Sequence, residues 1–131
     1  ESDDFSNVKI LVAEDNEINA EIITELLDCI GIKCVIAEDG EEALRVFTES
    51  SPDEFDMVFM DIQMPNMDGY KATRTIRNLS DKEKAGITIV AMTANAFEED
   101  KQNAYEAGMN WHIAKPIKID ELMSALTEIL K

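Results

Sequence analysis

Short apolar runs alternate with longer amphipathic segments five times along the chain. The apolar runs predict strands at about 8–13, 33–37, 56–60, 87–92 and 111–114. The longer segments predict helices at about 16–30, 40–50, 69–79, 95–107 and 119–130. Strict alternation of strands and helices is typical of a parallel sheet covered by helices on both faces. We therefore predict one α/β domain at 8–131, preceded by a polar linker or tail at 1–7.

Residues that favour helix ends lie at most of these boundaries: Asn16, Asp39 with Glu42, Asn95 with Glu98, Gly31 and Gly108. The helix at 95–107 is unusual because residues 98–103 are all polar, which leaves mainly Phe97, Ala104 and Ala107 to anchor it. A weakly anchored helix is a candidate moving part. The segment 80–86 is expected to be an ordinary hydrophilic loop.

The size and composition of the chain exclude several classes of function. The 131 residues are 45% hydrophobic, enough for a core without disulfides or a structural metal. A net charge of −16 disfavours nucleic acid as a partner, because phosphate binding needs clusters of Lys and Arg. No apolar stretch reaches the roughly 18 residues of a membrane span. Cys29 and Cys34 are expected to be small buried thiols in a reducing compartment, with too few ligands for zinc.

Reactive side chains follow four of the predicted strands. Glu14 and Asp15 end the first run, Asp61 the third, Thr93 the fourth and Lys115 the fifth. The carboxyl ends of parallel strands share one edge of a sheet, where such folds bind ligands. Carboxylates, a hydroxyl and an ammonium group at one edge suit phosphoryl transfer with a divalent metal.

Four segments, in order and each at a predicted strand end, carry a family resemblance: Val12-Ala13-Glu14-Asp15-Asn16, Met60 through Gly69, Ala91-Met92-Thr93-Ala94 and Ala114-Lys115-Pro116-Ile117. From about residue 8 to 130 the chain resembles the receiver domain of two-component response regulators. Segments 15–19 and 110–117 are most similar to receivers of hybrid sensor histidine kinases. The resemblance implies a flavodoxin-like sheet in the order 2-1-3-4-5.

The resemblance also implies a role for each acidic residue. Asp61 would accept the phosphoryl group from a phosphohistidine and become an aspartyl phosphate. Glu14, Asp15 and Asp61 would hold Mg²⁺, with Mn²⁺ as an alternative ion, and the backbone carbonyl of Gln63 would complete the protein ligands. If these residues have no catalytic role, Asp61 is a helix-capping or turn aspartate. Glu14 and Asp15 are then a pair of solvated acids at the start of a helix.

Further residues are assigned by the same resemblance. Lys115 would pair with Asp61 at rest and neutralise the transferred group, aimed by a cis bond to Pro116. Thr93 would bind a phosphoryl oxygen as a switch. His112 stands where many receivers have Tyr or Phe, which leaves open pH sensitivity or a partly buried structural role. Gln63 and Asn95 would tune the lifetime of the phosphate.

The partner is expected to dock beside the acidic pair. Ile18 lies off the predicted core face of the first helix and Ile22 lies at its margin. Both are candidates to meet a histidine phosphotransfer domain or a histidine kinase, and an ordinary exposed isoleucine is the alternative. His112 lies on the last strand, so the donor histidine belongs to another domain. We expect no nucleic-acid or membrane contact by this domain.

Two other functions compete with this one. A haloacid-dehalogenase-like phosphatase also uses an aspartate and Mg²⁺, but it needs a second acid where this chain has Gln63. A pseudo-receiver would bind partners without phosphate, yet such members lack residues that are present here. The polar start predicts a piece of a longer protein that begins in a linker, with a tag remnant as the alternative. We expect this domain to be cytoplasmic and leave open a parent protein that is anchored in a membrane. A hybrid kinase is the favoured origin, and a stand-alone regulator is the alternative.

Overall fold

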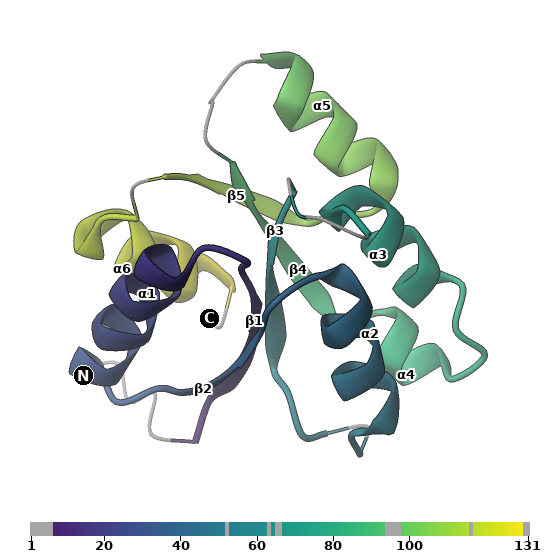
Figure 1. The fold of residues 1–131 in the computed structure, drawn as a ribbon, viewed down its shortest axis with the longest axis horizontal. Coiled ribbons are helices and arrows are strands. Elements are labelled where there is room, and N and C mark those ends of the chain that lie inside the picture. Colours follow the sequence, from purple (N-terminus) through teal and green to yellow (C-terminus); the bar gives the residue numbers. More distant parts are fainter. Residues whose placement is uncertain are drawn as a thin grey trace.

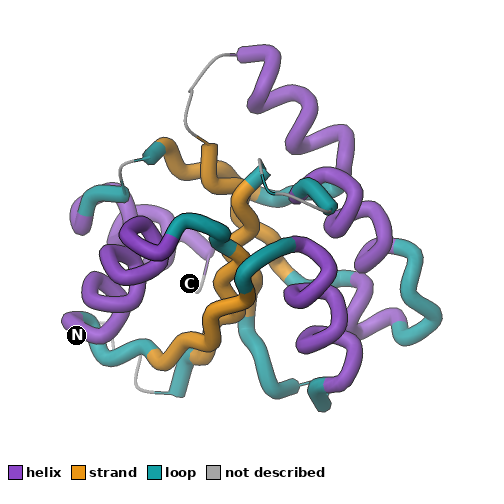
Figure 2. Tube along the Cα trace, in the orientation of Figure 1, coloured by secondary structure: helices purple, strands orange, loops and turns teal. Residues whose placement is uncertain are grey.

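A five-stranded parallel sheet forms the centre of the computed structural model, which describes residues 7–51, 53–62, 64, 67–93, 98–115 and 117–129 (Figures 1 and 2). Its strands are β1 (Lys9–Ala13), β2 (Lys33–Ala37), β3 (Met57–Asp61), β4 (Thr88–Thr93) and β5 (Trp111–Ala114). They lie in the order β2-β1-β3-β4-β5, and every pair is parallel. The predicted fold class and strand order are confirmed.

Helices cover both faces of the sheet (Figure 1). One face carries α1 (Glu17–Cys29) and α6 (Ile119–Ile129). The other carries α2 (Gly40–Glu49), α3 (Gly69–Arg77) and α5 (Glu98–Ala107), with the short α4 (Lys82–Ala85) next to α3. The side chains of α5 are described from residue 101 onward.

The core is split into two layers by the alternation of side chains along each strand. In β1, Ile10 and Val12 pack with the α1 and α6 layer, whereas Leu11 and Ala13 pack with the α2 and α3 layer. All four are fully buried, as expected for a strand covered on both faces. This explains why the strands read as continuous apolar runs.

The first helix separates its faces as the sequence predicted. Ile23 and Leu27 are buried against the sheet, whereas Ile18 and Ile22 are 67% and 40% exposed. Asn16 caps the helix, because its Oδ1 accepts hydrogen bonds from the backbone N–H groups of Ile18 and Asn19 at 2.9 and 3.0 Å. The cap fixes where α1 begins, directly beside the acidic pair.

The segment 80–86, predicted as an ordinary loop, contains α4. Asp81 caps it by accepting from the backbone N–H groups of Glu83 and Lys84. Lys84 is buried, and its Nζ donates to the backbone oxygens of Phe47 and Thr48 at 3.1 and 2.8 Å. The prediction was wrong because so short a helix shows no helical periodicity, and a lysine alone gives no sign of burial.

The two cysteines differ from the prediction of buried thiols. Cys29 is exposed on the last turn of α1, so that prediction was wrong for it. Cys34 is half-buried on the edge strand β2, where burial raises the pKa of its thiol despite a 3.8 Å contact with the Thr24 hydroxyl. An edge strand covers its side chains less completely than the central strands do.

The outer helix α5 is thinly anchored in its described part. Ala104 and Ala107 are buried, while Tyr105 is 49% exposed. Its end is held by Arg77, whose Nε donates to the Gly108 carbonyl at 2.8 Å. That α5 moves remains a prediction, and Asn95 and Phe97 lie outside the described residues.

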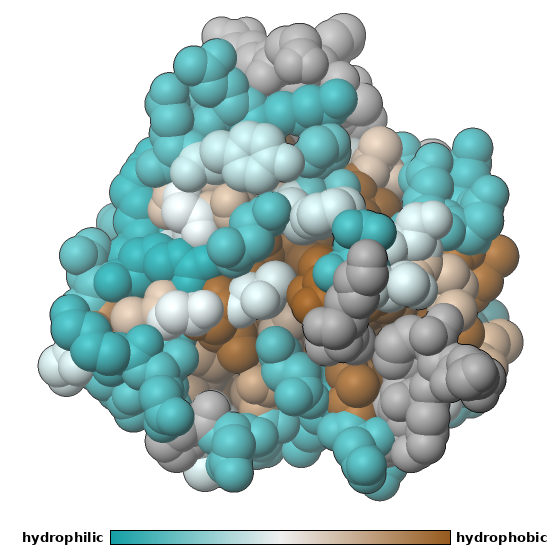
Figure 3. All heavy atoms as spheres, turned by 180° about the vertical axis from the view of Figure 1, so that it is seen from behind, coloured by the Kyte–Doolittle hydropathy of each residue, from teal (hydrophilic) through white to brown (hydrophobic). Residues whose placement is uncertain are grey.

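Hydrophilic residues cover most of the rear face, with hydrophobic ones in the hollows between them (Figure 3). Within the described ranges, no helix is both long enough and apolar enough to cross a membrane.

Candidate functional site

Four strand ends converge on one edge of the sheet. Asp61 is the last residue of β3, and its Cα pairs in register with Met92, next to Thr93 at the end of β4. Thr93 in turn pairs with Ala114, which precedes Lys115. The sequence predicted this convergence from strand ends alone, and the structure brings these residues together.

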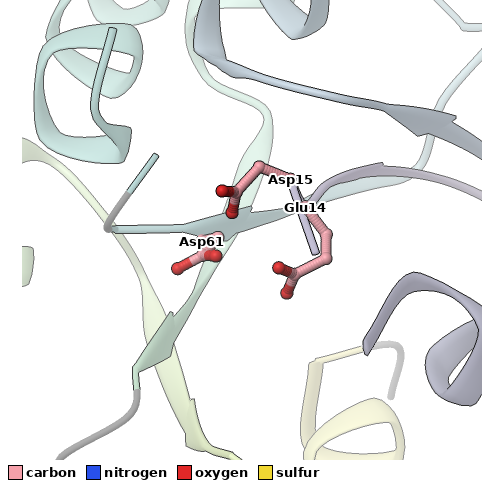
Figure 4. Close-up of side chains that lie close together, drawn as sticks. All are labelled: Glu14, Asp15 and Asp61. Carbon is pink, nitrogen blue, oxygen red and sulfur yellow. The ribbon is translucent and has the colours of Figure 1, made fainter. Parts of the chain in front are cut away.

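Three carboxylates lie together at this edge (Figure 4). One oxygen from each of Glu14, Asp15 and Asp61 lies within 4.8 Å of the other two. Glu14 and Asp61 are each only 3% exposed, whereas Asp15 is open to solvent. Crowded carboxylates repel one another, and a divalent cation that prefers oxygen ligands relieves that repulsion. The donor set and its access to solvent therefore fit Mg²⁺.

The Glu14 side chain is held in place from two sides. Its Oε2 accepts a hydrogen bond from the backbone N–H of Asn16 at 3.1 Å. Its Oε1 lies 2.8 Å from the Nζ of Lys115. The backbone N–H of Glu14 also donates to the carbonyl of Ala37 at the end of β2. A carboxylate restrained this way keeps one orientation toward its neighbours.

Lys115 bridges the two buried carboxylates. Its Nζ lies 2.8 Å from Asp61 Oδ2 as well as 2.8 Å from Glu14 Oε1. The expected contact with Asp61 is thus present. Burial of the ammonium by itself would lower the pKa of Lys115, but hydrogen bonds and charge attraction from Asp61 and Glu14 outweigh burial and raise that pKa above its ordinary value. Lys115 therefore stays charged.

Thr93 is 2% exposed at the end of β4. Its backbone oxygen accepts a 2.8 Å hydrogen bond from the N–H of Lys115, which ties the lysine's backbone to the strand next to Asp61. Three other predicted residues, Gln63, Asn95 and Pro116, lie outside the described residues. Their assigned roles stay predictions.

Gly69 is a site residue whose reason was not visible in the sequence. It begins α3, and its N–H donates to the Ile62 carbonyl at 3.3 Å. A Cβ at this position would collide with the backbone oxygen of Asp61. Glycine therefore lets α3 begin against the end of β3. The sequence predicted that a helix begins at residue 69, but not the close approach of the two backbones.

His112 lies half-buried on β5. Its Nδ1 is 3.2 Å from the Tyr105 hydroxyl, and the two rings meet edge to face with centroids 6.1 Å apart. Nothing in the sequence pattern indicated this tyrosine, because it belongs to the polar side of α5. His112 thus links β5 to α5.

Comparisons with known proteins agree with this geometry. The family model described as the response regulator receiver domain matches residues 10–127. Hybrid signal transduction histidine kinase L of Dictyostelium discoideum is 41% identical over 87% of this chain. Sensor histidine kinase RcsC of Escherichia coli K12 is 38% identical over 95%. The chain spans only 7% and 12% of the lengths of these two relatives.

Solved structures agree as well. The receiver domain of sensor histidine kinase PA1611 from Pseudomonas aeruginosa, with a magnesium ion coordinated in its active site cleft, is 36% identical with a TM-score of 0.83, covering 95% of this chain and 98% of that one. The Ssk1 receiver of Saccharomyces cerevisiae, crystallised with the histidine phosphotransfer protein Ypd1, is 30% identical with a TM-score of 0.83, covering 92% and 87%. This chain belongs to the response regulator receiver domain family.

Proposed function

We propose that this domain accepts a phosphoryl group on Asp61 from a phosphohistidine of a partner protein. A carboxylate oxygen of Asp61 attacks the phosphorus, the bond from phosphorus to the imidazole nitrogen breaks, and the imidazole leaves with that electron pair. The observation that carries the proposal is the Lys115 ammonium, held 2.8 Å from both Asp61 and Glu14, whose carboxylates cluster with that of Asp15.

The chain's own residues prepare this step. Glu14 and Asp61 hold Lys115 charged and close to the reacting carboxylate. As Asp61 gains the phosphoryl group, its carboxylate charge is lost in the new bond, and the ammonium turns to the phosphoryl oxygens. Thr93, buried at the neighbouring strand end, offers its hydroxyl to a second of these oxygens. That rearrangement would start the switch.

A divalent cation completes the proposal. Mg²⁺ held by Glu14, Asp15 and Asp61 would offset the carboxylate charge and stabilise the charge on the transferred group, and Mn²⁺ has suitable ligands here too. The magnesium ion in the PA1611 receiver supports this assignment. The backbone carbonyl of Gln63 is the proposed additional ligand.

The test of acceptance uses acetyl phosphate, a small donor that needs no protein partner. With Mg²⁺, intact-mass measurement should show the gain of one phosphoryl group. Chelation of the metal with EDTA should prevent that gain. No mass gain with Mg²⁺ in a folded protein would argue against acceptance from small donors and favour the pseudo-receiver alternative, which the complete set of acids, threonine and lysine otherwise disfavours.

The proposed partner surface consists of Ile18 and Ile22. Both are exposed on α1 shortly after the acidic pair. The Ssk1 receiver crystallised with Ypd1 supports a histidine phosphotransfer domain as the class of partner. The similarity to hybrid kinases supports an origin in such a protein. A location of this domain in the cytoplasm is part of the same proposal.

Ile18→Asp tests that surface. We expect the variant to take phosphate from a phosphorylated histidine phosphotransfer domain at least about tenfold more slowly, because a charge replaces an apolar contact that the interface buries. Its labelling by acetyl phosphate should match that of the wild type. Equal loss with both donors would mean that the substitution disturbs the site itself and would refute the docking role.

A further inference from the structure

A small cavity lies beside Lys115, which is one of its lining residues. Its volume is about 10 Å³, close to the space that one water molecule needs. Its polar lining residues are Glu14, Asn19 and Lys115, and its apolar lining residues are Ile22, Ile23, Met92 and Ile117. The cavity therefore joins the reactive edge of the sheet to the first turn of α1.

Asn19 is the one lining residue whose polar side chain has no assigned use. It lies half-buried on α1, and its backbone N–H is already bonded to the Asn16 cap. Across the described ranges, no protein group hydrogen-bonds to its carboxamide. Asn19 is half-buried, so solvent can reach part of its carboxamide, and on the side of the cavity a water molecule is the partner of suitable size.

Lys115 has one hydrogen-bond donor left for such a water molecule. An ammonium group carries three N–H donors, and the contacts with Asp61 and Glu14 use two of them. A water in the cavity could accept the third and donate to the Asn19 carbonyl oxygen. Two or more polar partners are what a buried water requires.

We propose that Asn19 binds one water molecule in this cavity and through it positions the Lys115 ammonium between Asp61 and Glu14. Asn19 is thus a positioning residue that touches neither the phosphoryl group nor the metal. The water restrains the lysine before reaction and leaves its other two N–H groups directed at the carboxylates. The effect on phosphorylation rests on the proposed function, whereas the effect on the lysine does not.

The first measurement follows the Lys115 ammonium itself in the unphosphorylated protein. Asn19→Leu keeps the size of the side chain and removes its polar atoms. In ¹⁵N-labelled protein, the Nζ protons of Lys115 should exchange with solvent about fivefold faster in this variant, the change expected for the loss of one hydrogen bond. Asn103→Leu, at an exposed asparagine of α5, is the matched control and should leave the exchange unchanged.

The second measurement is a double-mutant cycle on the rate of labelling by acetyl phosphate. Asn19→Leu should slow labelling about fivefold in the wild-type background and leave it unchanged in the Lys115→Ala background, because the water acts only through the lysine. The small donor avoids any effect of α1 on docking. A merely structural role for Asn19 would slow labelling equally in both backgrounds.

Two results would overturn the proposal: unchanged proton exchange in Asn19→Leu, or the same loss of rate with and without Lys115. If the wild type accepts no phosphate at all, the proposed function fails, but the exchange measurement still decides the role of Asn19. Faster exchange together with a loss of rate confined to the background that retains Lys115 supports it.

Discussion

Two lysines of this domain are withdrawn from solvent, and their surroundings differ in charge. Lys115 lies at the reactive edge with its Nζ between the carboxylates of Asp61 and Glu14. Lys84 lies on α4, with its Nζ on the neutral backbone oxygens of Phe47 and Thr48 and 5.6 Å from the centre of the Phe47 ring. Among the described residues, no carboxylate forms an ion pair with Lys84.

Because of this difference, the contacts of Lys115 can change with the state of the site, whereas those of Lys84 stay the same. Backbone oxygens at the end of α2 keep the same charge in every state of the protein, so Lys84 can serve only to hold α2 and α4 together. Carboxylates change charge when they are phosphorylated or bind metal, so the balance around Lys115 changes with them. We therefore expect Lys115 to matter for chemistry and Lys84 for stability.

The largest expected effect is on phosphorylation. Lys115→Ala should slow labelling by acetyl phosphate on the order of 100-fold, as expected for the loss of one group that stabilises developing charge in a reaction. The rate is measured from intact mass over time at fixed Mg²⁺. Lys84→Ala should label within about twofold of the wild type, since it touches no residue of the site. A similar loss in both variants would break the comparison.

The second-largest expected effect is on stability, and here the substitution of Lys84 is the one that matters. Lys84→Met should lower the free energy of unfolding by about 2 kcal/mol, because the Thr48 oxygen loses its hydrogen bond in a covered position. Chemical denaturation gives this value, and the slope of the transition should not change. Retention of wild-type stability would show that water replaces the ammonium fully and that the contact is not structural.

Metal binding gives a smaller, third effect. At a Mg²⁺ concentration tenfold above its Kd, the wild type should gain roughly 1.4 kcal/mol of stability. Lys84→Met should keep this gain, whereas Asp15→Asn should lose most of it because one carboxylate of the cluster is removed. Thermal unfolding with and without Mg²⁺ measures the gain. An equal gain in Asp15→Asn would place the ion elsewhere.

The smallest effect is the dependence of stability on alkaline pH. The pKa of Lys115 in the folded protein is raised above the ordinary lysine value of 10.5. Its contribution to stability is therefore complete below about pH 10.5 and is lost as pH rises through the higher folded pKa. The stability difference between wild type and Lys115→Met should shrink in that range. A difference that grows with pH would contradict the sign of the shift.

The same two lysines show what the sequence could predict. Lys115 was found because it follows an apolar run and because strand ends of a parallel sheet meet at one edge, which also located Glu14, Asp15, Asp61 and Thr93. The strand order came from family resemblance, since alternation alone gives only the fold class. Helix caps such as Asn16 were visible because capping depends on local sequence.

Lys84 was missed because its role depends on a contact with α2, which lies 36 and 37 residues earlier in the chain. No local pattern reveals such a contact. The same holds for Gly69, whose need for a missing Cβ is set by the carbonyl of Asp61, and for the pairing of Tyr105 with His112. Cys29 was misplaced because a helix end near the solvent gives a weak apolar pattern.

The most direct test of the central claim locates the phosphoryl group chemically. Wild type and Asp61→Asn are treated with acetyl phosphate and Mg²⁺, then reduced with borohydride, which converts an aspartyl phosphate to homoserine. Peptide mapping should find homoserine at position 61 in the wild type and at no position in Asp61→Asn. Homoserine at another position, or a phosphorylated Asp61→Asn variant, would contradict Asp61 as the acceptor.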